Sequence, residues 1–162
     1  MQDSLIRLSN EEIDLYKQVT DFKGTFQDRE KYIYEMSIDI KYRNIFLKYH
    51  TLYKETQVLE ALKRQIFIQW YAQAEPMAFT GINALDPAVE KDNIDILGQL
   101  ICNNKIDSEF TEMIFCYNDI TEWFFNAYPD FVPFLGLLKR KSNDLLRIPS
   151  IDRGQMGIYF NR

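Results

Sequence analysis

Residues 25–75 read TFQDREKYIYEMSIDIKYRNIFLKYHTLYKETQVLEALKRQIFIQWYAQAE, and this stretch of 51 residues contains no glycine and no proline. Glycine and proline are the strongest interrupters of helices, so their absence favours long helical segments. A single helix of this length would extend roughly 75 Å, which is too long for one compact domain. The stretch therefore predicts two helices, with a break between His50 and Gln57.

The second of these helices is predicted over residues 55–74. Apolar side chains recur in it at the spacing of one helical face: Val58, Leu59, Leu62, Ile66 and Trp70. A face of this kind is typical of a helix that packs against a core.

Residues 31–42 allow two interpretations. Apolar and polar side chains alternate from Tyr32 to Tyr42, which is the period of a half-buried strand. The same region also places Lys31 four residues before Glu35, as oppositely charged pairs are spaced on a helix surface, and no turn residue bounds it. We predict a helix here and keep a strand as the alternative.

Cap signals mark the helices on both sides of this stretch. Ser9-Asn10-Glu11-Glu12 has the pattern of a capping box and predicts a short helix over residues 10–21, ending before Gly24.

The connection over residues 76–86 contains several large apolar side chains, so we expect it to pack against the body of the protein. Asp86-Pro87 then provides an N-cap followed by proline at the first helical position, which predicts a helix to about residue 103.

Residues 108–128 are apolar over most of a helical circumference, and we expect this helix to be the central one. A last helix is predicted over 134–146, and residues 149–162 are expected to form an extended arm or a short docked strand. Residues 1–162 are thus predicted to be one all-α domain, a bundle or short helical array of about six helices.

The composition is that of a globular domain, with 46% hydrophobic and 27% charged residues. Its 12 Phe, 10 Tyr and 2 Trp are better explained by core filling than by an aromatic binding surface. Cys102 and Cys116 lie in apolar segments and are expected to be buried, reduced thiols. Because no secretory leader and no membrane-spanning run are visible, we expect a cytoplasmic protein.

One internal similarity suggests a repeat. Trp70 and Trp123 are each followed by a second aromatic residue, by alanine after four positions and by proline after six. A duplicated helical hairpin would produce such a pattern. Because helices commonly end before proline, we interpret it as coincidence.

The sequence contains no recognisable catalytic or metal-binding motif. His50 is the single histidine, whereas zinc and di-iron sites need several converging ligands, and no glycine-rich phosphate loop is present. We interpret His50 as a structural histidine near a helix end. Glu75, Asp119 and Glu122 are carboxylates near apolar positions, but each is as easily a surface or capping group. We predict no cofactor and no metal, and the sequence favours a protein that is not an enzyme over an enzyme.

Charge is distributed unevenly along the chain. The net charge of −5 consists of −9 over residues 1–135 and +4 over residues 136–162. The basic residues that could attract an anion are Lys139, Arg140, Lys141, Arg147 and Arg153. A nucleic-acid-binding domain is usually basic, whereas the pI here is about 5.0. Anion or RNA binding through residues 139–153 is therefore the weakest functional hypothesis.

The leading hypothesis is a non-enzymatic module that binds another protein, because catalytic sets are absent while aromatic residues and an apolar loop are present. The predicted binding residues surround that loop: Trp70, Tyr71, Glu75, Met77, Phe79 and Ile82. A second copy of the chain is compatible with the same role. The alternative is a small-molecule binding protein or enzyme, with a pocket between helices that residues 76–86 close.

Overall fold

The computed structural model describes residues 2–140 and 152–161, and within these ranges the chain is all-α, as predicted, with no strand. The helices are α1 (Gln2–Asp21), α2 (Phe26–Glu35), α3 (Ile38–Thr56), α4 (Leu59–Ala74), α5 (Met77–Thr80), α6 (Pro87–Cys102), α7 (Ser108–Ile120), α8 (Glu122–Asn126), α9 (Val132–Leu135) and α10 (Gly154–Tyr159). The predicted count of about six matches the longer helices, α1–α4, α6 and α7, and the short ones raise the total. Among these helices, none is both long and apolar enough to cross a lipid bilayer.

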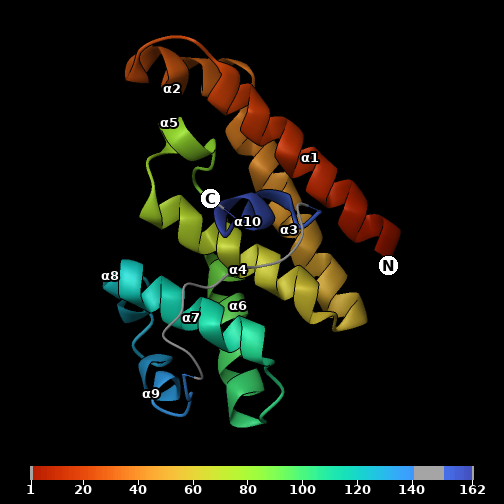
Figure 1. Cartoon of the computed structure of the whole chain (residues 1–162), viewed down its shortest axis with the longest axis vertical. Coiled ribbons are helices and arrows are strands. Elements are labelled where there is room, and N and C mark those ends of the chain that lie inside the picture. The colour runs from red at the N-terminus through yellow and green to blue at the C-terminus, as the bar shows by residue number, and fades with distance from the viewer. Residues whose placement is uncertain (1, 141–151, 162) are drawn as a thin grey trace.

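The helix at the centre of the fold is α4 (Figure 1). Every residue from Ala61 to Tyr71 is buried, and α3, α6, α7 and α10 all pack against this helix. The prediction that residues 108–128 form the central helix is wrong. That segment breaks at Thr121 into α7 and α8, and its apolar circumference is divided between a buried face and exposed side chains such as Trp123.

Two residues in the left-handed conformation divide the stretch without glycine or proline. Gln57, with φ of 56°, ends α3 at the C-terminal edge of the predicted break, so residues 51–56 are helical and the next helix begins at Leu59 instead of residue 55. Ser37, with φ of 51°, separates α2 from α3 at a position that the sequence did not indicate. Residues 31–42 are helical on both sides of this second break, which excludes the strand.

The start of α1 differs from the prediction. The helix begins at Gln2, so Ser9 and Glu12 lie inside it and do not cap it. Both residues are buried, because their side chains form hydrogen bonds with residues far along the chain. A capping box does exist in the structure, but it lies between Thr25 and Asp28 at the start of α2.

In the second half of the chain, the helix predicted from Asp86-Pro87 is confirmed, whereas the helix predicted over residues 134–146 is only partly present. Asp86 accepts hydrogen bonds at the start of α6 and Pro87 is its first residue, as predicted. The helix predicted over 134–146 is wrong for residues 136–140, which are not helical, and residues 141–146 lie outside the described ranges. Cys102 and Cys116 are free, but Cys102 is exposed because it lies on the outer side of the last turn of α6.

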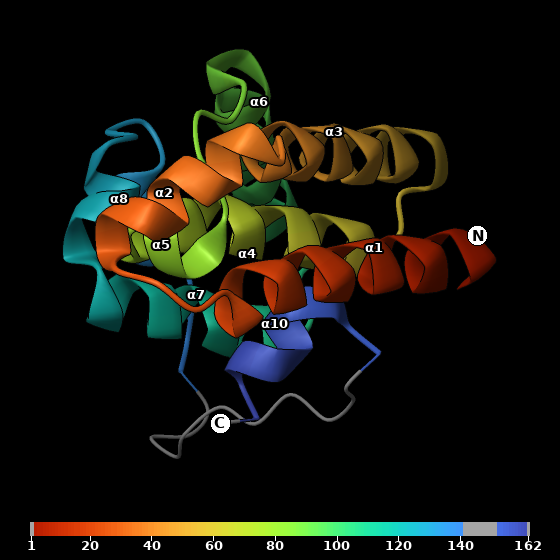
Figure 2. The ribbon, with the colours of Figure 1, turned by 90° about the horizontal axis from the view of Figure 1, so that it is seen from above.

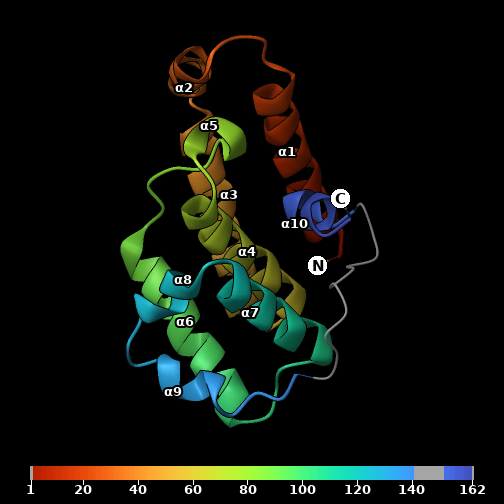
Figure 3. The same ribbon diagram turned by 60° about the vertical axis from the view of Figure 1, so that its left-hand side comes forward.

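The described part of the C-terminal segment, residues 152–161, forms α10 instead of a strand or an extended arm. This helix packs against α1 and α4, as Figures 1 and 2 show from two directions and Figure 3 from a third. Met156 and Phe160 are buried in this contact. The backbone of α10 is satisfied partly within the segment, by bonds from Gly157 N–H to Arg153 O and from Phe160 N–H to Met156 O, and partly by Glu12, which accepts from the Gln155 N–H.

Residues 76–86 pack against the body of the protein, as expected from their apolar side chains. The short helix α5 lies within them and ends at Gly81, whose φ of 76° is the left-handed conformation that favours glycine. A Cβ atom on Gly81 would lie 2.9–3.1 Å from side-chain atoms of Val19, Ile38 and Tyr42. The turn therefore depends on the absence of a side chain at this position.

We predict that Gly81→Ala lowers the free energy of unfolding by roughly 1–3 kcal/mol, because alanine is strained at positive φ and its methyl group enters occupied space. The measurement is denaturant unfolding followed by circular dichroism. Gly136→Ala is the matched control, since its Cβ atom would meet no atom closer than 3.5 Å and its φ is −67°. Equal effects of the two substitutions would contradict the tight turn.

Candidate functional site

The structure separates the predicted binding residues into a buried and an exposed group. Trp70, Tyr71 and Ile82 are buried in the core, so they form no accessible surface. The indole of Trp70 is 0% exposed, and its Nε1 donates a hydrogen bond to Oγ1 of Thr121 at 2.6 Å. The prediction of a partner surface is therefore wrong for these three residues. Their large apolar area is used to pack α4 against its neighbours.

The exposed group consists of Glu75, Met77 and Phe79. Glu75 is exposed at the C-terminal end of α4, and Met77 is half-buried at the start of α5. The single turn of α5 directs Ala78 and Thr80 into the core, which leaves Phe79 on the outside with 47% of its surface exposed. An exposed phenylalanine held by a buried turn is the part of the predicted site that the structure leaves accessible.

Phe79 forms a surface cluster with two residues of α2, at the end of the molecule where α2 and α5 lie together (Figures 1 and 3). We call Phe26, Arg29 and Phe79 the aromatic platform. The Phe26 and Phe79 rings meet edge to face with their centroids 5.7 Å apart, and Phe26 is itself 43% exposed. The guanidinium of Arg29 lies over the Phe79 ring, 5.9 Å from its centroid. Sequence analysis missed Phe26 and Arg29, because nothing local relates them to the loop 50 residues later.

The cation of the aromatic platform is not neutralised by a carboxylate. Arg29 donates a hydrogen bond at 3.5 Å to the backbone oxygen of Ala78 in α5 and another at 3.5 Å to that of Phe22, in the connection before α2. Its Nε atom is buried and has no hydrogen-bond partner within the described ranges. No salt bridge involves Arg29 among the residues whose positions are described. The platform thus combines two exposed rings with an unpaired positive charge.

The two arginines of the predicted basic cluster that the structure describes, Arg140 and Arg153, are each paired with carboxylates. Arg140 pairs with Asp119 at 2.5 Å and lies over the Phe115 ring, whereas Arg153 is largely buried between carboxylates of other helices. Both guanidinium groups are already neutralised, so they do not fit an anion site. Lys139 is exposed, and Lys141 and Arg147 lie outside the described residues.

A buried ionic network is the main feature that sequence analysis missed. Arg153 bonds to both Glu60 and Glu109, and Lys63 bonds to Glu109 at 2.8 Å and to Asp107 at 2.7 Å. The two hydrogen-bonded cations hold the pKa of Glu109 down to about 2, with Arg153 contributing most. The signal in the sequence was the pair of cations at positions 63 and 64, in the middle of an otherwise apolar helix face.

Arg64 extends this network to α1. It pairs with Glu60 of its own helix at 2.7 Å and donates hydrogen bonds to Ser9 and, at 3.4 Å, to the hydroxyl of Tyr49. Tyr49 in turn donates a hydrogen bond to the fully buried carboxylate of Glu12. Burial raises the pKa of Glu12 from 4.5 to about 7, although Tyr49 and other hydrogen-bond donors act in the opposite direction.

The network contains one more carboxylate than cations when Glu12 is ionised. Its carboxylates are Glu12, Glu60, Asp107 and Glu109, and its cations are Lys63, Arg64 and Arg153. Four negative groups face three positive groups, so the network is neutral when Glu12 is protonated. Burial is the main cause of the raised pKa of Glu12, and repulsion from the Glu60 carboxylate adds to it.

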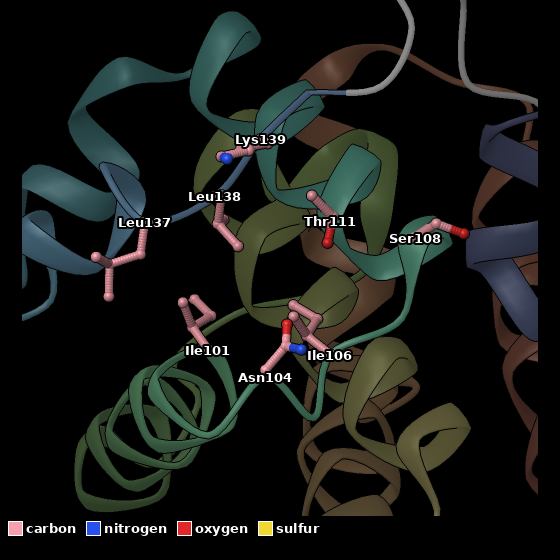
Figure 4. Close-up of a pocket in the computed structure, with 8 residues that line it drawn as sticks. All are labelled: Ile101, Asn104, Ile106, Ser108, Thr111, Leu137, Leu138 and Lys139. Atoms are coloured by element: carbon pink, nitrogen blue, oxygen red, sulfur yellow. The ribbon is translucent and has the colours of Figure 1, made fainter.

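A cavity of about 340 Å³ lies between the end of α6, the start of α7 and residues 137–139. In Figure 4, Leu138 points toward Ile101 and Ile106 from the opposite wall, and the polar lining residues are Asn104, Ser108, Thr111 and Lys139. Residues 76–86 do not line this cavity. The predicted small-molecule pocket closed by that loop is therefore not the cavity seen here.

The remaining side chains that could take part in catalysis or metal binding do not form a cluster among the described residues. His50 lies within α3, with Nδ1 3.2 Å from Asn93 and Nε2 3.3 Å from Asp92, which fits a structural role although the residue is not at a helix end. Burial raises the pKa of the Cys116 thiol to about 11, which disfavours the reactive thiolate. Among residues 2–140 and 152–161, no three histidine, cysteine or carboxylate side chains are grouped to hold a metal ion.

We predict that Glu12 makes the protein less stable as the pH rises from 4.5 to 7. A carboxyl whose pKa is higher in the folded than in the unfolded protein stabilises the fold below its unfolded pKa, and this stabilisation is lost as the pH rises through the folded pKa. The shift from 4.5 to about 7 corresponds to about 3 kcal/mol in the free energy of unfolding. Denaturant unfolding between about pH 5 and about pH 8 measures it.

Glu12→Gln should remove this pH dependence, since glutamine keeps the size of the side chain but does not titrate. Glu109, with its lowered pKa, loses its stabilising effect only as the pH falls below 4.5 toward 2, so it does not interfere. Glu11→Gln is the control, because Glu11 pairs with Lys48 at the surface and should leave the wild-type profile unchanged. Parallel profiles for wild type and Glu12→Gln would show that Glu12 does not titrate in this range.

No family model, no curated protein and no solved structure matches this chain. Its function therefore has to be inferred from the side chains of this chain alone. The accessible group that bears on function is the aromatic platform of Phe26, Arg29 and Phe79, since aromatic residues and arginine are enriched at protein interfaces.

Proposed function

We propose that the protein is a helical interaction module that binds another protein through the aromatic platform of Phe26, Arg29 and Phe79. The observation that carries this proposal is the exposed pair of rings beside a guanidinium that has no carboxylate partner among the described residues. Rings that remain exposed in the free protein provide apolar area for a partner to cover.

The chemistry of the aromatic platform defines the kind of partner that it fits. Two rings offer an apolar contact for an aliphatic or aromatic side chain. The unpaired guanidinium of Arg29 favours a carboxylate next to that side chain, because arginine and carboxylate form charge-assisted hydrogen bonds. We therefore expect the partner to present an apolar side chain flanked by aspartate or glutamate.

The rigidity of the aromatic platform supports the same proposal. One hydrogen bond from Arg29, to the backbone oxygen of Ala78, joins α2 to the turn that carries Phe79, and the start of α2 is fixed by the capping box of Thr25 and Asp28. Side chains that are already ordered lose little conformational entropy when a partner binds. The platform is thus suited to binding without rearrangement of the backbone.

The alternative functions have less support in the arrangement of side chains. The cavity near Lys139 could hold a small molecule, but its polar lining residues Asn104, Ser108, Thr111 and Lys139 include no pair of acidic and basic side chains for catalysis. Of the residues predicted for anion or RNA binding, Arg140 and Arg153 are paired with carboxylates, which lowers their capacity to bind an anion. Ligand-dependent shifts in melting temperature and salt-dependent affinity for RNA would favour these alternatives.

We predict that Phe79→Ala and Phe26→Ala each lose a stoichiometric partner while changing the melting temperature little, because the two residues are 47% and 43% exposed and lie outside the buried core. The measurement is affinity capture from native lysate followed by quantitative mass spectrometry of the bound proteins. The captured protein is then purified, and its affinity is determined for wild type and variants. A carboxylate in its binding segment is expected to couple with Arg29 in a double-mutant cycle.

Trp123→Ala is the matched control, since Trp123 is 58% exposed on α8 and lies outside the aromatic platform. It should retain the partner. Loss of binding in Trp123→Ala but not in Phe79→Ala would show that the interface lies on α8 and not on the aromatic platform. Trp70→Ala should instead lower the free energy of unfolding by about 3–5 kcal/mol, as expected for a buried tryptophan.

A further inference from the structure

A groove of about 290 Å³ lies between α1 and α3, which pack side by side and run in opposite directions (Figures 1 and 2). We call it the α1–α3 groove. Side chains of the two helices line it: Glu11, Asp14, Leu15, Gln18, Lys41, Asn44, Ile45 and Lys48. Because every lining residue belongs to one of these helices, the hydrogen-bonded backbone of each helix holds its wall in place.

The bottom of the α1–α3 groove is apolar. Leu15 and Ile45 line it, although the two residues are only 5% and 2% exposed, and both belong to the hydrophobic core. An apolar group placed on these side chains would cover the apolar area that still faces the groove, which is favourable in water.

The two walls of the α1–α3 groove carry opposite charges. The carboxylates of Glu11 and Asp14 come from α1, and the ammonium groups of Lys41 and Lys48 come from α3. One pair closes across the groove, since Nζ of Lys48 lies 2.7 Å from Oε2 of Glu11. Asp14 and Lys41 form no salt bridge with any residue in the ranges 2–140 and 152–161. One carboxylate and one ammonium group thus remain available on opposite walls.

The positions of Asp14 and Lys41 along the helices explain why they do not pair with each other. Counting in opposite directions from the Glu11–Lys48 ion pair places Asp14 opposite Ile45. Lys41 lies four residues before Ile45, which is about 6 Å along a helix. The two available charges are therefore offset along the groove by about one helical turn.

This arrangement of charge defines the class of ligand that the α1–α3 groove fits. An anion drawn to Lys41 would be repelled by the carboxylates of the opposite wall, and a cation drawn to Asp14 would be repelled by the lysines. A zwitterion is attracted by both walls. In an α-amino acid one carbon atom separates the ammonium group from the carboxylate, and each can lie roughly 2.8 Å from its counter-charge, so the molecule can bridge an offset of about 6 Å.

We propose that the α1–α3 groove binds a free α-amino acid with an aliphatic side chain. Asp14 accepts hydrogen bonds from the ammonium group, Lys41 donates to the carboxylate, and the aliphatic side chain lies on the apolar bottom of the groove. The volume of the groove is at the lower end for ligand pockets, which suits a ligand of this size. The inference is independent of the aromatic platform, which lies on α2 and α5.

The test is a titration of the full-length protein with L-leucine and L-methionine at neutral pH, followed by ¹H–¹⁵N NMR. We expect saturable shifts of residues in α1 and α3, with a dissociation constant on the order of 1 mM, as is typical of a ligand with so few atoms. Absence of saturable shifts in these helices with both amino acids overturns the proposal.

Two analogues of leucine each lack one charge. Leucine amide keeps the ammonium group without the carboxylate, and N-acetylleucine keeps the carboxylate without the ammonium group. Each should bind roughly threefold to tenfold more weakly than leucine, because each loses one ion pair at a partly exposed site. Analogues that bind as tightly as leucine would show that the groove does not recognise a zwitterion.

Two variants assign each charge of the ligand to its wall. Asp14→Asn should weaken the binding of leucine but not that of N-acetylleucine, and Lys41→Gln should weaken the binding of leucine but not that of leucine amide. Both residues are exposed, so circular dichroism should show an unchanged fold. Asp3→Asn and Lys17→Gln are the matched controls, since they remove the same charges from exposed positions of α1 outside the groove. Leucine affinities of Asp14→Asn and Lys41→Gln that equal those of the controls overturn the proposal.

Discussion

The burial of two cations, Lys63 and Arg64, in the central helix constrains the rest of the structure. Each side chain is only 6% exposed, and a buried charge is strongly unfavourable unless it is paired. Their own helix supplies only one of the carboxylates, Glu60. The others come from the start of α7, and further acceptors come from α1 and from the backbone of the C-terminal segment. Helices distant in sequence therefore have to converge around the first half of α4.

The same network links the protonation of Glu12 to the packing of the C-terminal helix α10. Glu12 brings a fourth carboxylate to three cations, and its burial makes protonation favourable near pH 7. Because Glu12 also accepts the hydrogen bond from the backbone of Gln155, its protonation state and the docking of α10 affect the same contact. The stability of the fold, the charge of the network and the packing of α10 thus all depend on the side chain of Glu12.

Aromatic residues serve two roles that composition alone does not separate. Trp70, Tyr117 and Phe67 fill the space around α4 and account for much of the core. Phe26 and Phe79 have the same chemistry but lie outside, because the turn of α5 ends at Gly81 and directs Phe79 away from the core. Whether a ring is buried or exposed therefore depends on the backbone around it.

The all-α fold, the break near Gln57, the start of α6 at Asp86 and the packing of the apolar loop could be read from the sequence, because propensity, caps and periodicity act over a few residues. The role of Ser9 and Glu12 could not, since the same spacing suits a local cap and a contact 143 residues away. The candidate site shows the same difference between local features, which the sequence indicates, and contacts between distant residues, which it does not. Exposed Phe79 was predictable from its loop, whereas Phe26, Arg29 and the burial of Trp70 were decided by tertiary packing, which alone determines which side chains from distant segments meet.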